Sequence, residues 1–354
     1  MHSATHPFAL QLCRWLAAAA LAIVTVPAAL AMPAFSTLYV LGDSLSDTGN
    51  TQAVLGTNAL VANLAGYGAN GRFSNGPVWH EPLATSLGLP PATRSRSGGN
   101  NYSHGGARLD RATGQSAGLL FQYDSYFAGP GAGGADSAAL YAVWAGGNDM
   151  RDLVSSSSPQ AGVQTALSSL NVVLTGLLDA GARTLLVPSL PDLGRIPENR
   201  NTPNAASASF VSGLWNDGLF SVLSGLAGQY SSASIYYLNV FGIFNSVLDN
   251  PASFGFTNTT GQCRSVTNFG FTETSCANPD TWVFWDAIHP TRAAHAVLGA
   301  AAFDLLSTGA PLPVPEAATV LQLALGLMLL AAFAARRARR AKASTASRTA
   351  PHEA

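Results

Sequence analysis

Charged residues are scarce in this chain of 354 residues: Asp, Glu, Lys and Arg make up 10% of it, against 47% hydrophobic residues. Residues 32–335 carry eleven arginines and eighteen acidic residues, a formal charge of −7, whereas residues 336–354 carry +5. An acidic body argues against nucleic acid as a partner. The sequence also lacks a Gly-rich phosphate loop and zinc-ligand spacings, so we expect neither a cofactor nor a metal.

The amino-terminal end is typical of a targeting segment. Residues 1–31 begin weakly basic, continue through an apolar stretch from Leu16 to Val26, and close with Ala29-Leu30-Ala31. That closing tripeptide is the small-x-small pattern that signal peptidases cut, so we interpret residues 1–31 as a signal peptide and Met32 as the first mature residue. An uncleaved anchor is the alternative, although the apolar stretch is shorter than the ~20 residues a span needs.

The carboxyl-terminal end resembles a membrane anchor. A Pro-rich spacer at 309–316 precedes the apolar segment 317–335, which is followed by the basic tail 336–354. Nineteen apolar residues span most of a ~30 Å hydrocarbon core, and the Arg cluster that follows should stay cytoplasmic. We therefore predict an exported body that is held at the cell envelope by its carboxyl-terminal end.

The order of these segments resembles the PEP-CTERM sorting signal of Gram-negative bacteria, although Val314-Pro315-Glu316-Ala317 lacks the second proline of that motif and the tail runs on to Ala354. The resemblance implies a membrane and a sorting enzyme as partners of this end of the chain. Anchoring in the envelope and release outside the cell after processing both remain open.

Cysteine is also scarce, with three residues in the whole chain. Cys13 lies in the expected signal peptide, which leaves Cys263 and Cys276 as an even pair in an exported protein. Neither has a second Cys or a His at metal-ligand spacing, so we predict a disulfide between them rather than a metal site.

Short apolar runs alternate with long helical patterns between the two ends. This alternation predicts one domain over residues 36–308, with a parallel sheet covered by helices on both faces. Three long segments rich in Gly, Asn and Ser are expected to shape the site or to form an irregular insertion. The expected strands are 37–41, 140–145, 184–188 and 235–240, the helices are 161–180, 205–230 and 290–306, and the irregular segments are 55–82, 92–136 and 245–281.

Two short motifs indicate nucleophilic catalysis. Gly42-Asp43-Ser44-Leu45 directly follows the first apolar run, which places Ser44 at the carboxyl end of a strand, where ligands collect in open α/β sheets. Asp286 and His289 lie three residues apart near the end of the domain. Because a serine needs a base to take its proton and a third group to orient that base, these motifs together offer the three parts.

Four segments resemble, in order, the conserved blocks of the GDSL (SGNH) lipase and esterase family. They are Gly42-Asp43-Ser44-Leu45-Ser46-Asp47-Thr48-Gly49-Asn50, Asn101-Tyr102-Ser103-His104-Gly105-Gly106-Ala107, Gly146-Gly147-Asn148-Asp149 and Asp286-Ala287-Ile288-His289-Pro290; Gly71-Arg72-Phe73-Ser74-Asn75-Gly76 is similar to a further family stretch. The resemblance covers about residues 36–308. It implies a flavodoxin-like three-layer α/β/α fold and an ester hydrolase.

The resemblance also implies a role for each site residue. Ser44 would attack the ester carbonyl, His289 would act as its base, and Asp286 would orient the imidazole. The backbone N–H groups of Ser44 and Gly106 and the side-chain amide of Asn148 would form the oxyanion hole. Two alternatives stay open: the adjacent Gly105 as the donor, and Asp286 as the N-cap of the following helix.

Three further aspartates adjoin the blocks: Asp43, Asp47 and Asp149. We interpret them as supports that fix loops by hydrogen bonds rather than as an acid/base pair. The histidines His80, His104 and His295 are expected in packing or surface roles.

The substrate class stays open at this level, because members of the family cleave lipid esters, short acyl esters and sugar acetyl groups. An acyltransferase with the same residues, or a cell-surface or matrix component that binds while catalysis is incidental, are the alternatives to an exported ester hydrolase.

Overall fold

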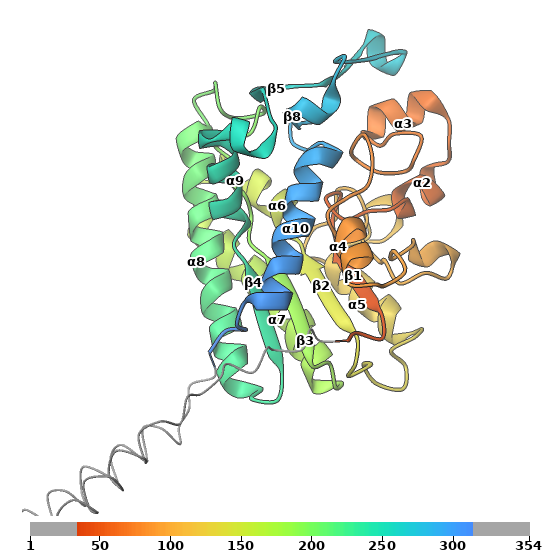
Figure 1. The fold of residues 1–354 in the computed structure, drawn as a ribbon, viewed down its shortest axis with the longest axis vertical. Coiled ribbons are helices and arrows are strands. Elements are labelled where there is room, and N and C mark those ends of the chain that lie inside the picture. Colours follow the sequence, from red (N-terminus) through yellow and green to blue (C-terminus); the bar gives the residue numbers. More distant parts are fainter. Residues whose placement is uncertain (1–33, 314–354) are drawn as a thin grey trace, which may run out of the picture.

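The computed structural model describes residues 34–313 (Figure 1). The predicted signal peptide, membrane segment and basic tail lie outside these residues. A four-stranded sheet forms the centre, with β1 (Leu38–Gly42), β2 (Leu140–Trp144), β3 (Thr184–Pro188) and β4 (Ser234–Leu238) in this order, all parallel. All four strands fall where continuous apolar runs predicted them, because strands buried on both faces need apolar side chains at every position.

Helices cover both faces of this sheet (Figure 1). On one face α7 (Pro159–Asp179) packs against α8 (Ala205–Gln229) and α5 (Leu119–Phe127). On the other, α10 (Arg292–Thr308) packs against α4 (His80–Ser86). The predicted three-layer α/β/α fold is therefore present, with α6 (Gly147–Leu153) and α9 (Val240–Asp249) at the carboxyl ends of the strands.

Among the described residues, α7 is the one helix long and apolar enough to cross a membrane. Its buried side chains include Leu167, Leu170, Val173 and Leu174, which belong to the same core as the central strands. The core helix of a globular domain can be as long and as apolar as a membrane span. Packing against the central strands therefore explains the apolar character of α7.

A polar segment takes the place of a fifth strand beside β1. Val40 donates to the carbonyl of Asn100 at 3.0 Å, Tyr102 donates to Val40 at 2.7 Å, and His104 donates to Gly42 at 3.2 Å. The chain thus runs parallel to β1 here although only an isolated bridge forms. With this segment counted, the strand order matches the flavodoxin-like arrangement that the sequence predicted.

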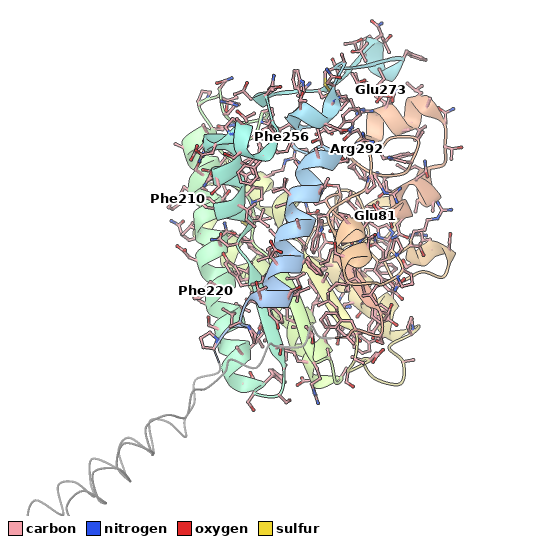
Figure 2. The ribbon with its side chains drawn as sticks, in the orientation of Figure 1. Glu81, Phe210, Phe220, Phe256, Glu273 and Arg292 are labelled. Atoms are coloured by element: carbon pink, nitrogen blue, oxygen red, sulfur yellow. A yellow bond between two sulfur atoms is a disulfide. The ribbon has the colours of Figure 1, made fainter. Side chains whose placement is uncertain are left out.

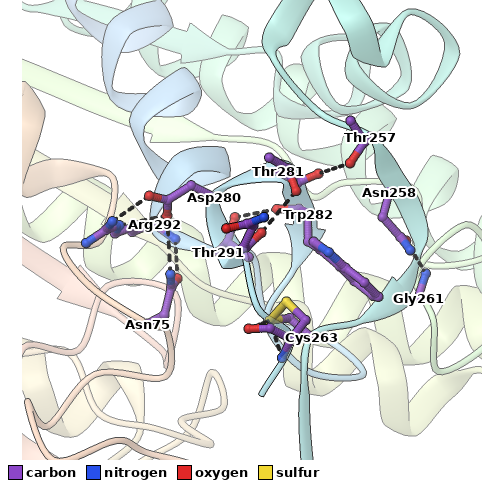
Figure 3. The surroundings of a disulfide bond; sticks show 12 residues. Asn75, Thr257, Asn258, Gly261, Cys263, Asp280, Thr281, Trp282, Thr291 and Arg292 are labelled. Atoms are coloured by element: carbon purple, nitrogen blue, oxygen red, sulfur yellow. Dashed lines mark hydrogen bonds and ion pairs between the residues drawn. A yellow bond between two sulfur atoms is a disulfide. The ribbon is translucent and has the colours of Figure 1, made fainter.

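The region predicted as an irregular insertion carries two small strand pairs. β5 (Asn258–Gln262) pairs in parallel with β8 (Trp282–Phe284), and β6 (Arg264–Thr267) pairs with β7 (Thr272–Ser275) as an antiparallel hairpin. The predicted disulfide between Cys263 and Cys276 is formed at the base of this hairpin (Figure 3). Short 3₁₀ turns at Ser95–Ser97, Gly114–Ser116, Pro251–Phe254, Asn268–Gly270 and Pro279–Thr281, and the helices α2 (Asn50–Leu55) and α3 (Ala59–Ala65), complete the described chain.

Candidate active site

Ser44 lies in the turn that follows β1, at the carboxyl edge of the sheet, and is 8% exposed. The last residue of the strand, Gly42, must be a glycine because a Cβ there would lie 2.2 Å from the carbonyl oxygen of Trp144 on β2. The side chain of Gln122 holds this end in place, accepting from the N–H of Gly42 at 2.9 Å and donating to its carbonyl at 2.8 Å. The direction in which Ser44 leaves the sheet is therefore fixed by buried contacts.

The structure brings Ser44, His289 and Asp286 together. Nε2 of His289 lies 2.8 Å from Oγ of Ser44, and Nδ1 of the same ring lies 2.8 Å from Oδ2 of Asp286. These distances allow a proton to pass from the hydroxyl to the imidazole while the carboxylate holds the ring. His289 is 7% exposed, so the pair is largely shielded from water.

The spacing of Asp286 and His289 sets the orientation of the carboxylate. Oδ1 of Asp286 accepts hydrogen bonds from the N–H groups of Ile288 at 2.9 Å and His289 at 2.8 Å, which leaves Oδ2 for the imidazole. Burial raises the pKa of Asp286, but His289 and these two N–H groups outweigh burial and hold its pKa below the usual range. The carboxyl group therefore stays ionised.

The helix that follows has its own cap, which removes one of the open alternatives. α10 begins at Arg292, and the hydroxyl of Thr291 accepts from the N–H of Ala294. Asp286 is therefore not the N-cap of this helix.

The segments that were expected to hold an oxyanion contain two glycines and an asparagine, of which Asn148 lines the same pocket as Ser44. Gly106 has a φ of 73° and adjoins Ala107, whose carbonyl accepts a hydrogen bond from Nδ2 of Asn148 at 2.9 Å. The N–H of Gly105 is already used, because it donates to Asp47 at 3.0 Å and to Thr51 at 2.8 Å. The N–H of Gly106 has no acceptor within the described part of the chain, which favours Gly106 over Gly105 as a donor.

Arg151 is a residue of the site that sequence reasoning missed. Its Nη1 donates to Oδ1 of Asn148 at 3.3 Å, and its other nitrogens bind Glu198 at 2.9 and 2.5 Å. The N–H of Glu198 in turn donates to the carbonyl of Ala287, 2.9 Å away, between Asp286 and His289. One ion pair thus links Asn148 to the segment that carries the imidazole. The link spans 47 residues along the sequence, and no short motif marks it.

The aspartates beside Ser44 do act as loop supports. Asp47 accepts from the N–H groups of Gly49 and Asn50, both at 2.7 Å, in addition to Gly105. Asp43 accepts from Leu45 at 3.0 Å, and Asp149 accepts from Leu109 at 3.1 Å. Burial raises the pKa of Asp43 and of Asp149 to about 6 each, so both carboxyl groups are kept at a cost in solvation.

The other histidines of residues 34–313 pack in the interior. His295 is fully buried, and its Nδ1 accepts from the N–H of Trp79 at 3.3 Å; burial lowers its pKa to about 3, so it stays neutral. A ring nitrogen of His80 lies 2.9 Å from the carbonyl of Ser46, and burial lowers the pKa of His80 as well. Nδ1 of His104 lies 2.9 Å from the carbonyl of Tyr102.

The segment around Phe73 contacts the loop that carries the imidazole. The ring of Phe73 lies 5.2 Å from that of His289, centre to centre. Oγ of Ser74 donates to the carbonyl of Pro290 at 2.9 Å, and Asn75 accepts from the N–H of Arg292 at 2.7 Å. The contact between Asn75 and the start of α10 can be followed in Figure 3.

An apolar pocket opens beside Ser44 and His289. It has a cavity volume of about 80 Å³ and is bounded by α9, α10, β8 and the loop that follows β3. Arg151, which is bound to Glu198, is the one cation among its lining residues within the described chain. Its apolar walls are formed by Leu190, Ile196, Val240, Ile243, Phe244, Val247, Val283, Ile288, Val297 and Leu298.

No group of His, Cys, Asp and Glu side chains in the described residues could hold a metal ion.

Comparisons with known proteins identify the family of this chain. The sequence pattern of the GDSL-like lipase/acylhydrolase family matches residues 38–302. The chain belongs to this family. Two GDSL esterase/lipases of Arabidopsis thaliana are 27% and 30% identical to it, over 77% and 75% of this chain and 88% and 84% of theirs.

Among solved structures, an acetylxylan esterase of Geobacillus stearothermophilus covers 78% of this chain and 97% of its own, with 13% identity and a TM-score of 0.43. A likeness this distant does not bear on the substrate of the GDSL-family protein described here.

Proposed function

We propose that this carboxylic ester hydrolase of the GDSL family acts through an acyl-enzyme on Ser44. The observation that carries the proposal is the continuous chain of hydrogen bonds from Ser44 through His289 to Asp286, each link 2.8 Å long. In this mechanism His289 takes the proton of Ser44 as the hydroxyl attacks the carbonyl carbon, and then delivers it to the leaving alcohol. A water molecule, activated by the same imidazole, releases the acid and restores Ser44.

We assign the oxyanion hole to the N–H groups of Ser44 and Gly106 and to the side-chain amide of Asn148. Gly106 supports this role by its left-handed backbone and its unused N–H. Nδ2 of Asn148 has two hydrogens, of which one is bound to Ala107, so the other can reach an oxyanion. Arg151, through Oδ1 of Asn148, keeps the amide from turning over.

The acyl part of the substrate is assigned to the apolar pocket beside Ser44. A sugar acetyl ester would leave most of these aliphatic walls uncovered, whereas a longer acyl chain would bury them. The pocket therefore favours an ester with an apolar acyl chain. Acyl transfer to another alcohol would use the same residues, and the products distinguish the two reactions.

Hydrolysis of p-nitrophenyl esters from acetyl to palmitoyl tests this proposal, with Ser44→Ala beside the wild type. Ser221→Ala, an exposed serine on α8, is the matched control. We expect turnover that rises with acyl length beyond acetyl, is lost in Ser44→Ala and is kept in Ser221→Ala. A folded wild-type protein that hydrolyses none of the esters, or a Ser44→Ala variant with full activity, contradicts the mechanism.

The proposed location of the enzyme rests on sequence alone. We propose that residues 1–31 direct export and that residues 317–335 hold the body at the cell envelope, with a sorting enzyme as a partner that releases it. The N–H of Leu312 donates to Ile235 at the amino-terminal edge of the sheet, so the chain leaves the body on the edge opposite Ser44. Membrane fractionation of the full chain and of a chain that ends at residue 316 tests the anchor; equal distribution between fractions would rule it out.

A further inference from the structure

Two phenylalanine side chains at the tip of the β6–β7 hairpin are largely exposed to solvent. Phe269 is 93% exposed and Phe271 is 75% exposed, the highest values among the large hydrophobic residues of the described chain. Next to them on α3, Leu64 is 65% exposed. Single exposed hydrophobic residues are common on protein surfaces, but three neighbours that are all largely exposed form a patch that calls for a partner.

The tip and α3 form one unit, which we call the rim. A Cβ on Gly270 would lie 2.8 Å from Leu60 and 2.9 Å from Leu64, so the turn packs directly on α3. Nδ2 of Asn63 donates to the carbonyl of Gly270 at 3.0 Å, and Oδ1 of Asn63 accepts from Arg264 at 3.2 Å. Figure 1 shows the hairpin and α3 next to each other at the end of the molecule that carries α9 and β8.

The turn holds Phe269 outward in an unfavourable conformation. Asn268, Phe269 and Gly270 have φ values of 52°, 54° and 93°, all in the left-handed region. Asn and Gly adopt this region readily, whereas Phe does not. Folding alone would favour Asn or Gly at position 269. A bulky apolar side chain that is kept there, strained and in water, indicates a function outside the fold.

The hairpin is attached to the segment that carries the catalytic groups. Cys263 donates to the carbonyl of Phe284 at 3.1 Å, and Arg264 donates to the carbonyl of Trp285 at 2.5 Å, directly before Asp286. The Cys263–Cys276 disulfide closes the base of the hairpin, and Arg264 is paired with Glu273, which Figure 2 labels on the hairpin. A surface bound by the tip would therefore lie at the same edge of the protein as Ser44.

We propose that the rim is a docking surface for a lipid surface, through which the enzyme meets esters that are embedded in lipid. Phe and Leu side chains are among those that enter the boundary between headgroups and acyl chains. Residues 48–71 contain no charged residue, and neither does the turn at 267–272. The acidic body would repel anionic lipid, so the surface it fits is a zwitterionic or neutral one.

A second copy of the chain fits this surface less well. Phe269, Phe271 and Leu64 together expose on the order of 300–500 Å², whereas a stable protein interface needs about 800 Å² from each partner. The tip is also convex, and a lipid surface needs no complementary shape to receive it.

The test places a reporter at the tip and uses the full chain with Ser44→Ala, so its result does not depend on catalysis. Phe269→Trp keeps an aromatic ring at the tip, and Phe210→Trp on α8, where Phe210 is 50% exposed, is the matched control. The chain has six tryptophans of its own, so the emission of the same chain with Phe269 is subtracted. With phosphatidylcholine vesicles, we expect the remaining emission of Phe269→Trp to shift to the blue and to be quenched by brominated acyl chains, in low salt and in high salt alike. The emission of Phe210→Trp should stay unchanged.

Four results would overturn the proposal. The first is no shift at position 269 in a folded protein, and the second is an equal shift at position 210. The third is a shift that needs anionic lipid and is lost in salt. The fourth is blue emission from the added tryptophan before vesicles are present, after subtraction of the emission of the same chain with Phe269, which would mean that another part of the chain or a second copy covers the rings.

The consequence for activity is measured separately, with an active Phe269→Asn/Phe271→Ala variant. We expect several-fold slower hydrolysis of an ester presented in phosphatidylcholine vesicles, with unchanged hydrolysis of a dissolved ester, and Phe210→Ala/Phe220→Ala as control. Because Asn suits the left-handed conformation, the melting temperature should stay the same or rise. If the variant hydrolyses the ester in vesicles as fast as the wild type does, the role of the rim is refuted. If the wild type hydrolyses neither the ester in vesicles nor the dissolved ester, the proposed function is refuted instead.

Discussion

Replacing Asp149 by asparagine should reduce the pH dependence of folding stability between pH 4.5 and 7.5. Oδ1 of Asp149 accepts from Leu109, but Oδ2 is buried without a hydrogen-bond partner in the described part of the protein. Burial raises its pKa from 3.8 to about 6. The folded protein therefore holds this proton more tightly than the unfolded chain, and the stability that it contributes is complete below pH 3.8 and is lost as the pH rises through 6.

The magnitude follows from the two pKa values. Their difference corresponds to about 3 kcal/mol at 1.36 kcal/mol per pKa unit, and about 2 kcal/mol of it falls between pH 4.5 and 7.5. The new amide adds a buried N–H group, and the free energy that this group costs does not depend on pH. This cost therefore cancels when the change in the free energy of unfolding at pH 4.5 is subtracted from the change at pH 7.5. We expect the variant to gain about 2 kcal/mol relative to the wild type over this interval.

Urea unfolding followed by tryptophan fluorescence at pH 4.5, 6 and 7.5 measures this difference. Asp152→Asn on the same helix is the matched control, because a hydrogen bond from Arg108 lowers the pKa of Asp152 and the sign is therefore opposite. Asp43, whose pKa is also about 6, leaves a residual pH dependence in the Asp149 variant. An effect of Asp149→Asn that is the same at all three pH values would refute the assignment of a raised pKa.

Three further changes test the site and its support. Asn148→Ala should lower kcat by ~10²–10³ with little change in KM, because an oxyanion donor acts in the transition state; an unchanged kcat would exclude Asn148 from the oxyanion hole. Replacing Cys263 and Cys276 together by serine should lower the free energy of unfolding by about 3 kcal/mol, measured as a lower melting temperature, and an unaltered midpoint would show that the loop is held without the disulfide. Ile243→Trp should fill the pocket and shift the preferred p-nitrophenyl ester to a shorter acyl chain, whereas the same chain-length profile would place the acyl group elsewhere.

The central strands and the long helices could be predicted because each is specified locally. A strand buried on both faces is apolar at nearly every position, and β1 to β4 follow this pattern except at Thr184 and Ser234, the first residues of β3 and β4. The segment beside β1 could not be predicted as part of the sheet. It holds Asn100 and Asn101, whose side chains donate hydrogen bonds to the carbonyls of Leu38 and Ser46 rather than pack in an apolar core.

The candidate site also contains one part that the local sequence specifies and another part that it does not. The spacing of Asp286 and His289 is a local feature, and one carboxylate satisfies two N–H groups and the imidazole within a single turn. The link from Arg151 to Glu198 joins separate loops after the chain has folded, and its residue types are common on any surface. Contacts of this second kind can be found only in three dimensions.

Two features of the described residues oppose folding, one in the loops near the carboxyl end of the sheet and one on the rim. Asp43 and Asp149 are carboxylates kept in surroundings that favour their neutral forms, and Phe269 is kept in a conformation and a solvent that both disfavour it. Asparagine at position 149 or 269 would suit the fold better. Residues that disagree with their local surroundings are typical of sites where a residue is retained for its chemistry or for a partner. Asp43 and Asp149 accept hydrogen bonds from the loops at Leu45 and Leu109, so we expect them to affect the chemical step only through these loops, whereas Phe269 should affect only how the ester is reached.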